Sequence, residues 1–290
     1  MESEIKRKKI IVIYHAECLD GFTAAWAVWK KLGERAAYAP AFYQQPLPED
    51  LKDKEVYMVD FSYPAEVVVK LKAANKKVVI IDHHRTAAES AKAADEHLFD
   101  LNHSGAYLAW QYFHPGKQMP ALVRYVEDGD LWMFKMPEAR AVLACLSLEK
   151  FSFSGWEKLA REMEVITRRR EMVQKGKLIM LYEQAIIDFV AKEAELVEFE
   201  GRKVLAVNFS YKPLTSELAH TLYKKKPPMS IVWREMGGEK RISLRSDGTV
   251  DVSAMAQKYG GGGHKAAAAF SLPASALLPW RRWEGKKYRV

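Results

Sequence analysis

The chain has 290 residues, 49% of them hydrophobic, which is long for one hydrophobic core and suits two packed domains. Its 45 Lys and Arg against 37 Asp and Glu give a net charge of +8, which favours an anionic substrate such as a nucleic acid or a nucleotide. Two cysteines exclude a disulfide framework, and no apolar stretch approaches the length of a membrane span or a signal-peptide core.

The N-terminal half alternates short apolar runs with longer segments that have helical spacing. The short runs are rich in Ile and Val, which is typical of buried strands. Strands that alternate with helices at this spacing form parallel sheets, so we expect a doubly wound parallel α/β sheet. The predicted strands are Ile10–Tyr14, Val56–Val59 and Val78–Ile81, and the predicted helices are Phe22–Leu32, Pro64–Ala74 and Ser104–Phe113, the last with Ser104 as N-cap.

Chemically active side chains follow each of these three predicted strands. His15 follows the first strand, Asp60 follows the second, and the tripeptide Asp82-His83-His84 follows the third. A polar turn whose side chains cap backbone groups would explain one such group. Three groups are better explained by a shared site, because ligands bind at the carboxyl ends of the strands in open α/β sheets. We therefore expect a metal site at this edge.

A fourth acidic group, Glu127-Asp128-Gly129-Asp130, comes after the partly apolar stretch 122–126. We expect a short glycine-containing turn here that adds carboxylate to the metal site. An ordinary acidic turn on the surface explains the group equally well.

The types of side chain indicate which metal would bind. Carboxylates and imidazoles predominate and only one cysteine, Cys18, is near, so a closed sulfur site for zinc is not expected. Manganese suits these ligands best and magnesium less well, with zinc and iron left open. The surplus of carboxylates predicts two ions, which would stabilise the attacking and leaving oxygens of a phosphoryl transfer.

The C-terminal half has a different pattern. Residues 156–194 are highly charged, with apolar residues at helical spacing, which predicts one or two long linking helices. Short strand-like pieces then return and predict a smaller mixed α/β domain. The expected division is a catalytic domain at 1–150, a helical linker at 151–195 and a substrate-binding domain at 196–290. The predicted strands of that last domain are 196–199, 203–208, 230–234 and 241–245, with a helix at 214–222.

Four consecutive glycines, Gly260 to Gly263, stand before His264. A glycine run is more often a flexible turn, but without Cβ atoms its N–H groups can also approach an anion closely. Arg245 could bind a phosphate through two hydrogen bonds, although pairing with a nearby aspartate would also explain it. We therefore expect a phosphate site made of Arg245, Gly262, Gly263 and His264.

The order of these motifs resembles the DHH phosphoesterase family, which is named for the tripeptide found here as Asp82-His83-His84. The family's first motif is usually His-x-Asp-x-Asp-Gly. Residues 15–21 read His-Ala-Glu-Cys-Leu-Asp-Gly, with one extra residue, and resemble an oligoribonuclease- and exonuclease-like branch with His-x-x-Cys-x-Asp-Gly. Asp60 matches the second motif and Asp128 the fourth, and the run Gly260–His264 is similar to the loop of the DHH-associated C-terminal domain.

The resemblance implies a role for each matching residue. Asp60 would bridge two divalent ions, and His84 would contact the phosphate or donate a proton. Asp82 would orient the two histidines or join the second ion. Glu17 and Cys18 depart from the family pattern, so one ion is expected to bind differently or more weakly. The implied metal ligands are His15, Asp20, Asp60, His83 and Asp128, and the implied catalytic residues are His84 and Asp82.

Together these features predict a cytoplasmic, manganese-dependent phosphodiesterase that releases mononucleotides from short single-stranded nucleic acid, with no membrane partner. A polyphosphatase, or a phosphohydrolase of small nucleotides or cyclic dinucleotides, is an alternative enzyme. A non-catalytic nucleotide-binding protein with an impaired metal site is an alternative of another class. The sequence leaves open the exact substrate, RNA or DNA preference, the polarity of cleavage, and whether the chain forms a homodimer.

Overall fold

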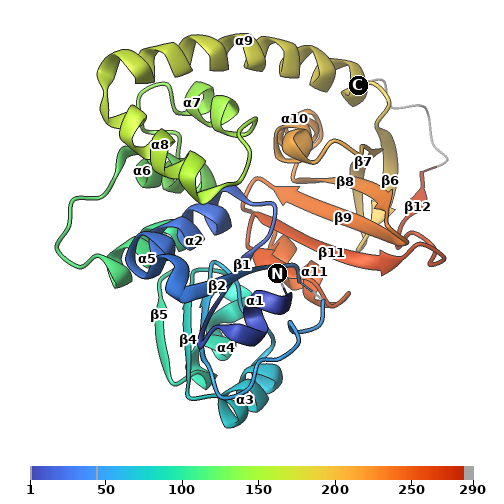
Figure 1. The fold of residues 1–290 in the computed structure, drawn as a ribbon. Coiled ribbons are helices and arrows are strands. Elements are labelled where there is room, and N and C mark those ends of the chain that lie inside the picture. The colour runs from blue at the N-terminus through green and yellow to red at the C-terminus, as the bar shows by residue number, and fades with distance from the viewer. Residues whose placement is uncertain (1, 44, 284–290) are drawn as a thin grey trace. The chain divides into compact units, whose positions relative to one another are not determined.

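A five-stranded parallel sheet forms the centre of the first of two units, residues 1–180, in the computed structural model, which describes residues 2–43 and 45–283 (Figure 1). The strand order is β2-β1-β3-β4-β5, so the predicted doubly wound parallel sheet is confirmed. The direction of winding reverses between β1 and β3, which makes their carboxyl ends a topological switch point. The strands are β1 (Ile10–His15), β2 (Ala36–Ala41), β3 (Glu55–Val59), β4 (Lys77–Asp82) and β5 (Glu96–Phe99).

Helices cover both faces of this sheet, because alternate residues of each strand point to opposite sides. Val12 and Ile81 join the core under α2, α5, α6 and α8, whereas Ile13 and Ile80 join the core that includes residues of α3 and α4. Burial on both faces explains why the strands are continuous apolar runs. The helices are α1 (Glu2–Arg7), α2 (Leu19–Leu32), α3 (Ala65–Ala74), α4 (Ala88–Ala93), α5 (Gly105–Phe113), α6 (Ala121–Asp130), α7 (Ala139–Leu146) and α8 (Phe153–Glu164).

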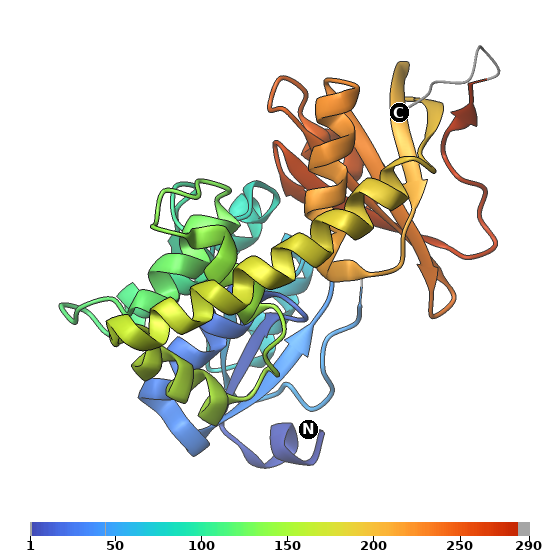
Figure 2. The ribbon, with the colours of Figure 1, turned by 90° about the horizontal axis from the view of Figure 1, so that it is seen from above.

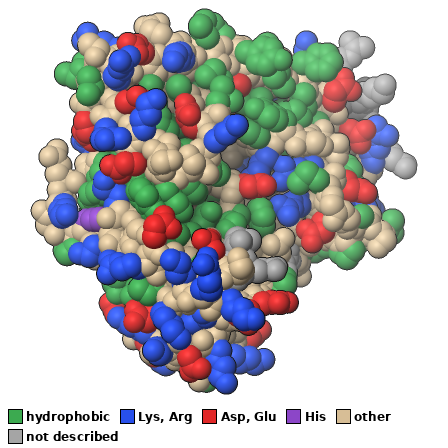
Figure 3. Space-filling view, in the orientation of Figure 1, with side chains coloured by type: hydrophobic (Ala, Val, Ile, Leu, Met, Phe, Trp, Pro, Cys, Tyr) green, Lys and Arg blue, Asp and Glu red, His purple; other side chains and the backbone are tan. Residues whose placement is uncertain are grey.

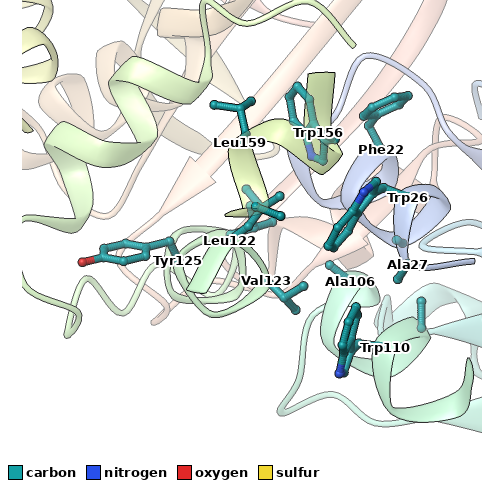
Figure 4. Close-up of a cluster of buried hydrophobic side chains, with 14 of the residues drawn as sticks. Phe22, Trp26, Ala27, Ala106, Trp110, Leu122, Val123, Tyr125, Trp156 and Leu159 are labelled. Atoms are coloured by element: carbon teal, nitrogen blue, oxygen red, sulfur yellow. The ribbon is translucent and has the colours of Figure 1, made fainter. Parts of the chain in front are cut away.

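Aromatic side chains fill the core between α2, α5 and α8 (Figure 4). The rings of Trp26 and Trp110 stack with 5.8 Å between their centroids, and Trp156 Nε1 donates a hydrogen bond of 3.0 Å to Thr23 Oγ1. Trp26 and Trp156 are both fully buried. These contacts hold α2 against α5, and that packing fixes the position of Asp20 in the first turn of α2.

A long helix, α9 (Ile166–Ala191), follows α8 and agrees with the predicted helical stretch. Figure 2 shows α9 as one continuous helix. The boundary between the two units lies within it, after Met180.

A seven-stranded mixed sheet forms the second unit, residues 181–290. Its order is β10-β11-β9-β8-β7-β6-β12; β7 and β8 are parallel, and the other neighbouring pairs are antiparallel. The predicted mixed C-terminal domain is thereby confirmed. The elements are β6 (Glu195–Phe199), β7 (Arg202–Asn208), α10 (Thr215–Lys225), β8 (Met229–Met236), β9 (Glu239–Ser246), α11 (Val252–Gln257), β10 (Gly262–His264), β11 (Ala267–Pro273) and β12 (Arg281–Arg282).

The surface carries both signs of charge. In Figure 3, Lys and Arg side chains gather in the lower part of the view, where Figure 1 shows α1 and α3, with Asp and Glu side chains between them. In the part of the chain that the structure describes, no helix has both the length and the apolar composition needed to cross a membrane.

Candidate metal centre

Three neighbouring strands bring their polar end residues to one edge of the parallel sheet. His15 is the last residue of β1, Asp60 directly follows β3, and Asp82 is the last residue of β4. The strands are parallel and in register, with Tyr14 beside Val59 and Val59 beside Ile81. The side chains at these three strand ends therefore meet at the switch point of the sheet, which is where α/β proteins bind ligands.

Asp60 is the residue shared by the sets of candidate metal ligands at this edge of the sheet. Its side chain is 1% exposed, and it belongs to three sets of candidate ligand atoms, each with its members within 4.8 Å of one another. The sets are His15 with Cys18 and Asp60, Asp20 with Asp60 and His83, and Asp60 with Asp82 and His84. A carboxylate shared by adjacent ligand sets is the arrangement that a bridge between two ions requires.

Several buried atoms at this centre make no hydrogen bond to the described residues. They include Asp60 Oδ2 and His15 Nδ1, which lie 3.4 Å apart, within the distance of an ion pair. Leaving a buried polar atom unpaired costs about 1–3 kcal/mol, so such atoms are rare in folded proteins. A carboxylate oxygen and an imidazole nitrogen are both good ligands for divalent ions. The residues present therefore fit a bound metal ion.

The N-terminus of α5 holds the Asp20 carboxylate. The backbone N–H of Gly105 donates to Asp20 Oδ2 at 2.7 Å, and that of Ala106 donates to Asp20 Oδ1 at 3.0 Å. Ser104 caps the helix as predicted, by accepting a hydrogen bond from the Tyr107 N–H. Each carboxylate oxygen has two lone pairs, so Asp20 can still bind an ion while it accepts these bonds.

Gly105 also sets the space available at the centre. A Cβ atom on Gly105 would lie 2.4 Å from Asp60 Cβ, 2.8 Å from Asp60 Oδ1 and 2.9 Å from Asp20 Oδ2, so only glycine fits without a shift. This role was not predicted from the sequence. The available signal was a glycine in the first turn of a predicted helix, where it lowers helix stability by about 1 kcal/mol relative to alanine.

The backbone of Asp60 is in the left-handed region, with φ at 53°. Non-glycine residues are uncommon there, and aspartate and asparagine are among those that tolerate it best. Its N–H donates to the Ile81 carbonyl at 2.9 Å. Such conformations occur at functional sites where the surrounding structure enforces them.

Buried carboxylates and imidazoles shift the pKa values of one another. Burial raises the pKa of Asp20 well above its usual range, and the charges of Asp60 and Asp130 add to that shift. Burial would also raise the pKa of Asp60, but His15 and the two histidines of the tripeptide outweigh it and hold that pKa well below its usual range.

The pKa values of His83 and Cys18 are shifted in ways that matter for metal binding. Burial lowers the pKa of His83, but the carboxylates of Asp130, Asp60 and Asp20 together raise it to about 11. The Cys18 thiol is only partly open to solvent, and this enclosure, together with nearby carboxylates, raises its pKa to about 12. Both groups therefore carry protons in the metal-free protein, and a bound cation would have to displace them.

Asp82 fixes the orientation of the tripeptide. Its Oδ1 accepts hydrogen bonds from the N–H groups of His83 (2.7 Å) and His84 (3.0 Å), and lies 2.7 Å from His84 Nδ1. In the tautomer that donates Nδ1–H to Asp82, Nε2 of His84 carries the lone pair. Asp82 thus holds the His84 ring in one orientation, and the catalytic role of the pair stays a prediction.

The fourth acidic group corrects the sequence prediction. It lies in the last turn of helix α6 and not in the expected turn between elements. Asp128 accepts hydrogen bonds from the N–H groups of Lys135 (2.8 Å) and Met136 (2.9 Å), so its carboxylate holds the loop after α6. Asp130 Oδ2 instead lies 3.6 Å from His83 Nε2. On a helix, residues two apart do not share a face, and Asp130 is the one that lies beside His83; a ligand role for Asp128 stays a prediction.

Two asparagine substitutions should separate these roles. Asp130→Asn is expected to weaken metal binding, because it removes a charge beside His83, and to leave the melting temperature of the metal-free protein nearly unchanged. Asp128→Asn should cost about 1–3 kcal/mol of folding stability, because a charged acceptor of two backbone N–H groups is lost, with the metal stoichiometry retained. Calorimetric titration with Mn²⁺ measures the metal affinity of both variants, and thermal unfolding measures their folding stability. The opposite pattern would return the ligand role to Asp128.

Comparison with family models finds a match in each of the two units. Residues 9–146 match the model of the DHH family, N-terminal domain, and residues 208–279 match that of the DHHA1 domain. After the models that they match, these two segments are called the DHH domain and the DHHA1 domain. Every residue of the candidate metal centre, from His15 to Asp130, lies inside the DHH match.

Individual relatives are distant. Uncharacterized protein R106 of Acanthamoeba polyphaga mimivirus is 27% identical over 297 residues, which cover 94% of this chain and 70% of R106. A solved DHH domain, described as a member of the s1p family of ribosomal proteins, is 16% identical with a TM-score of 0.60, over 98% of this chain and 85% of that one. Exonuclease RecJ bound to manganese is 16% identical with a TM-score of 0.48, over 93% of this chain and 88% of that one.

In the DHHA1 domain, the second half of the glycine run is in a strand, whereas Gly260 is in the turn after α11. Gly262–His264 forms β10, which pairs with β11. A Cβ on Gly261 would lie 2.1 Å from the Ala269 carbonyl oxygen, and one on Gly263 would lie 2.6 Å from that of Ala267. At these two positions the close approach to β11 accounts for the glycines. The alanines at 267–269 belong to β11.

Arg245 lies on β9, and its Nη2 donates to Ser216 Oγ at 2.8 Å. The two neighbouring aspartates form other contacts: Asp247 accepts from Thr249, and Asp251 caps α11 through Ser253. A phosphate role for Arg245 and for the glycine run stays a prediction.

Proposed function

We propose that this protein is a metal-dependent phosphoesterase that hydrolyses the phosphodiester bonds of short single-stranded oligonucleotides. One observation carries the proposal: Asp60 is shared by three sets of candidate ligands, and its buried Oδ2 has no hydrogen-bond partner among the described residues. We assign His15 and Asp60 to one ion, and Asp20, Asp60 and His83 to the other, with Asp130 in place of Asp128 beside it. When bound, two such ions would supply an activated water and offset the negative charge of the phosphate.

The chain's own residues would orient the substrate and move the proton. We propose that His84 contacts a phosphate oxygen, or protonates the leaving oxygen, through Nε2. Both roles require a hydrogen on Nε2. Because Nδ1–H donates to Asp82, 2.7 Å away, His84 must then be an imidazolium, and Asp82 would stabilise that charge. Asp82 is fully buried and keeps the ring in place, which is how a positioned carboxylate supports a catalytic histidine.

The choice of substrate rests on charge and on the second domain. The net charge of +8 favours a polyanion, and the DHHA1 domain offers Arg245, Gly262, Gly263 and His264 as a proposed phosphate site. We propose Mn²⁺ as the activating ion, because the set of Asp20, Asp60 and His83 combines oxygen and imidazole ligands.

The test uses purified full-length protein that is stripped of metal and supplied with Mn²⁺. The substrates are end-labelled RNA and DNA dinucleotides and short single-stranded oligomers, with polyphosphate and a cyclic dinucleotide in parallel. Stepwise release of mononucleotides, abolished by a chelator and in Asp82→Asn, is the expected result. Phosphate release from polyphosphate alone, or turnover of the cyclic dinucleotide alone, would replace the proposed substrate. No turnover of any substrate by protein that binds Mn²⁺ would contradict the enzymatic function.

A further inference from the structure

Cys18 lies beside His15 and Asp60 at the metal centre. Its sulfur, a ring nitrogen of His15 and a carboxylate oxygen of Asp60 all lie within 4.8 Å of one another. His15 Nδ1 and Asp60 Oδ2 are buried atoms without a hydrogen-bond partner among the described residues, and the Asp60 side chain is only 1% exposed. Three different ligand types, nitrogen, sulfur and oxygen, therefore converge on one point.

Helix capping gives no specific reason for a cysteine at this position. Cys18 is the N-cap of α2, with an extended backbone (φ −127°, ψ 134°), and its side chain makes no capping hydrogen bond, although the backbone N–H groups of Gly21 and Asp20 lower the pKa of the thiol. A Ser, Thr, Asp or Asn N-cap would stabilise the helix by about 1 kcal/mol. The thiol is not part of a disulfide, and it is partly exposed rather than packed in the core. Metal binding is the role for which sulfur is a better choice than these capping residues.

We propose that Cys18 is a metal ligand, and that His15, Cys18 and Asp60 form a mixed site that prefers a thiophilic ion such as Zn²⁺ or Co²⁺. The adjacent set of Asp20, Asp60 and His83 has no sulfur and suits Mn²⁺. Thiolate ligands select softer ions, and zinc binds combinations of Cys, His and Asp in proteins. The inference rests on the proposed two-metal function and adds to it: the two ions of the centre are different elements.

Cobalt provides a readout that does not depend on activity. A cysteine thiolate bound to Co²⁺ gives a charge-transfer absorption band in the near ultraviolet, which oxygen and nitrogen ligands do not give. Metal-free protein titrated with Co²⁺ is expected to develop this band. Cys18→Ser should lose the band, because its oxygen replaces the sulfur at nearly the same size. Cys145→Ala is the matched control, since it removes the other thiol, and it should keep the band.

Competition tests the preference for one ion over the other. Zn²⁺ is expected to displace Co²⁺ and abolish the band, whereas an equal concentration of Mn²⁺ should leave it in place. In Cys18→Asp, which supplies an oxygen ligand, the advantage of Zn²⁺ over Mn²⁺ should fall, as measured by calorimetric titration.

Equilibrium dialysis measures whether Co²⁺ or Mn²⁺ binds at all. It therefore distinguishes a failure of the Cys18 proposal from a failure of the whole metal centre. Co²⁺ that binds the native protein without the band, or a band that survives in Cys18→Ser, would overturn the role of Cys18 and leave the proposed phosphoesterase function intact. No binding of Co²⁺ or Mn²⁺ would overturn the metal centre, and both proposals would fail together.

Discussion

Asp60→Asn is expected to abolish the binding of both ions and to lower the phosphohydrolase rate by at least about 100- to 1000-fold. Asp60 belongs to three sets of candidate ligands, so one substitution removes a charge from all three. Asparagine is as well suited as aspartate to the left-handed backbone at φ 53°. The variant should therefore fold, and its defect should be one of metal binding.

Thermal unfolding measures this loss of metal binding and requires no substrate. At a Mn²⁺ concentration 100 times the dissociation constant, binding should stabilise the native protein by about 2.7 kcal/mol and raise its melting temperature by about 5–10 °C. Asp60→Asn should lose this rise. Asp188→Asn, at an exposed position on α9, is the matched control and should keep it. A full rise in melting temperature in Asp60→Asn would refute the bridging role.

Gly105→Ala is expected to lower activity by at least about 100-fold, although it adds only one methyl group. That methyl would overlap Asp60 Cβ at 2.4 Å and Asp20 Oδ2 at 2.9 Å, so two ligands must move. A displacement of about 1 Å in a catalytic constellation can reduce the rate by this factor. The shift should also weaken the two hydrogen bonds from the N-terminus of α5 to Asp20, and so reduce metal affinity.

A control for Gly105→Ala should also lose folding stability, but its added methyl group should not contact the metal centre. Gly33→Ala meets this need: φ of Gly33 is 53°, so alanine is strained there, and a Cβ would meet nothing within 4 Å. Each variant is assayed at 25 °C for turnover and for Mn²⁺ affinity, alongside its melting temperature. Equal losses of activity in the two variants would mean that Gly105 acts only through folding stability.

The strands at the edge of the metal centre could be predicted because their signal is local. Ile10–Tyr14, Val56–Val59 and Val78–Ile81 are apolar on both faces, and the observed strands differ from them by at most one residue at either end. Since parallel strands align their carboxyl ends, the meeting of His15, Asp60 and the tripeptide followed from the chain alone.

The fourth acidic group could not be placed by the same reasoning. A helix and a turn are both compatible with its acidic, glycine-containing sequence, and the choice determines which carboxylate faces His83. The packing of α6 on α2, α5 and α8 stabilises the helix, and this tertiary contact is not visible in a short window of sequence. The sequence therefore favoured Asp128, whereas in the structure Asp130 lies beside His83.

Steric requirements were also invisible in the sequence. Gly105 matters because of what lies opposite it, two carboxylates that are 45 and 85 residues away along the chain. The glycine run of the DHHA1 domain suggested an anion-binding loop, yet Gly261 and Gly263 are required by the carbonyl groups of β11. In both cases the reason for a missing Cβ is a neighbour that only the fold supplies.

The left-handed backbone of Asp60 limits which residues can stand at this position over evolutionary time. Glycine and asparagine satisfy the backbone but carry no charge, whereas glutamate carries the charge, tolerates this φ less well and reaches one methylene too far. Aspartate alone meets both demands. An exhaustive substitution library of the DHH domain, selected for function, should therefore retain a single amino acid at position 60.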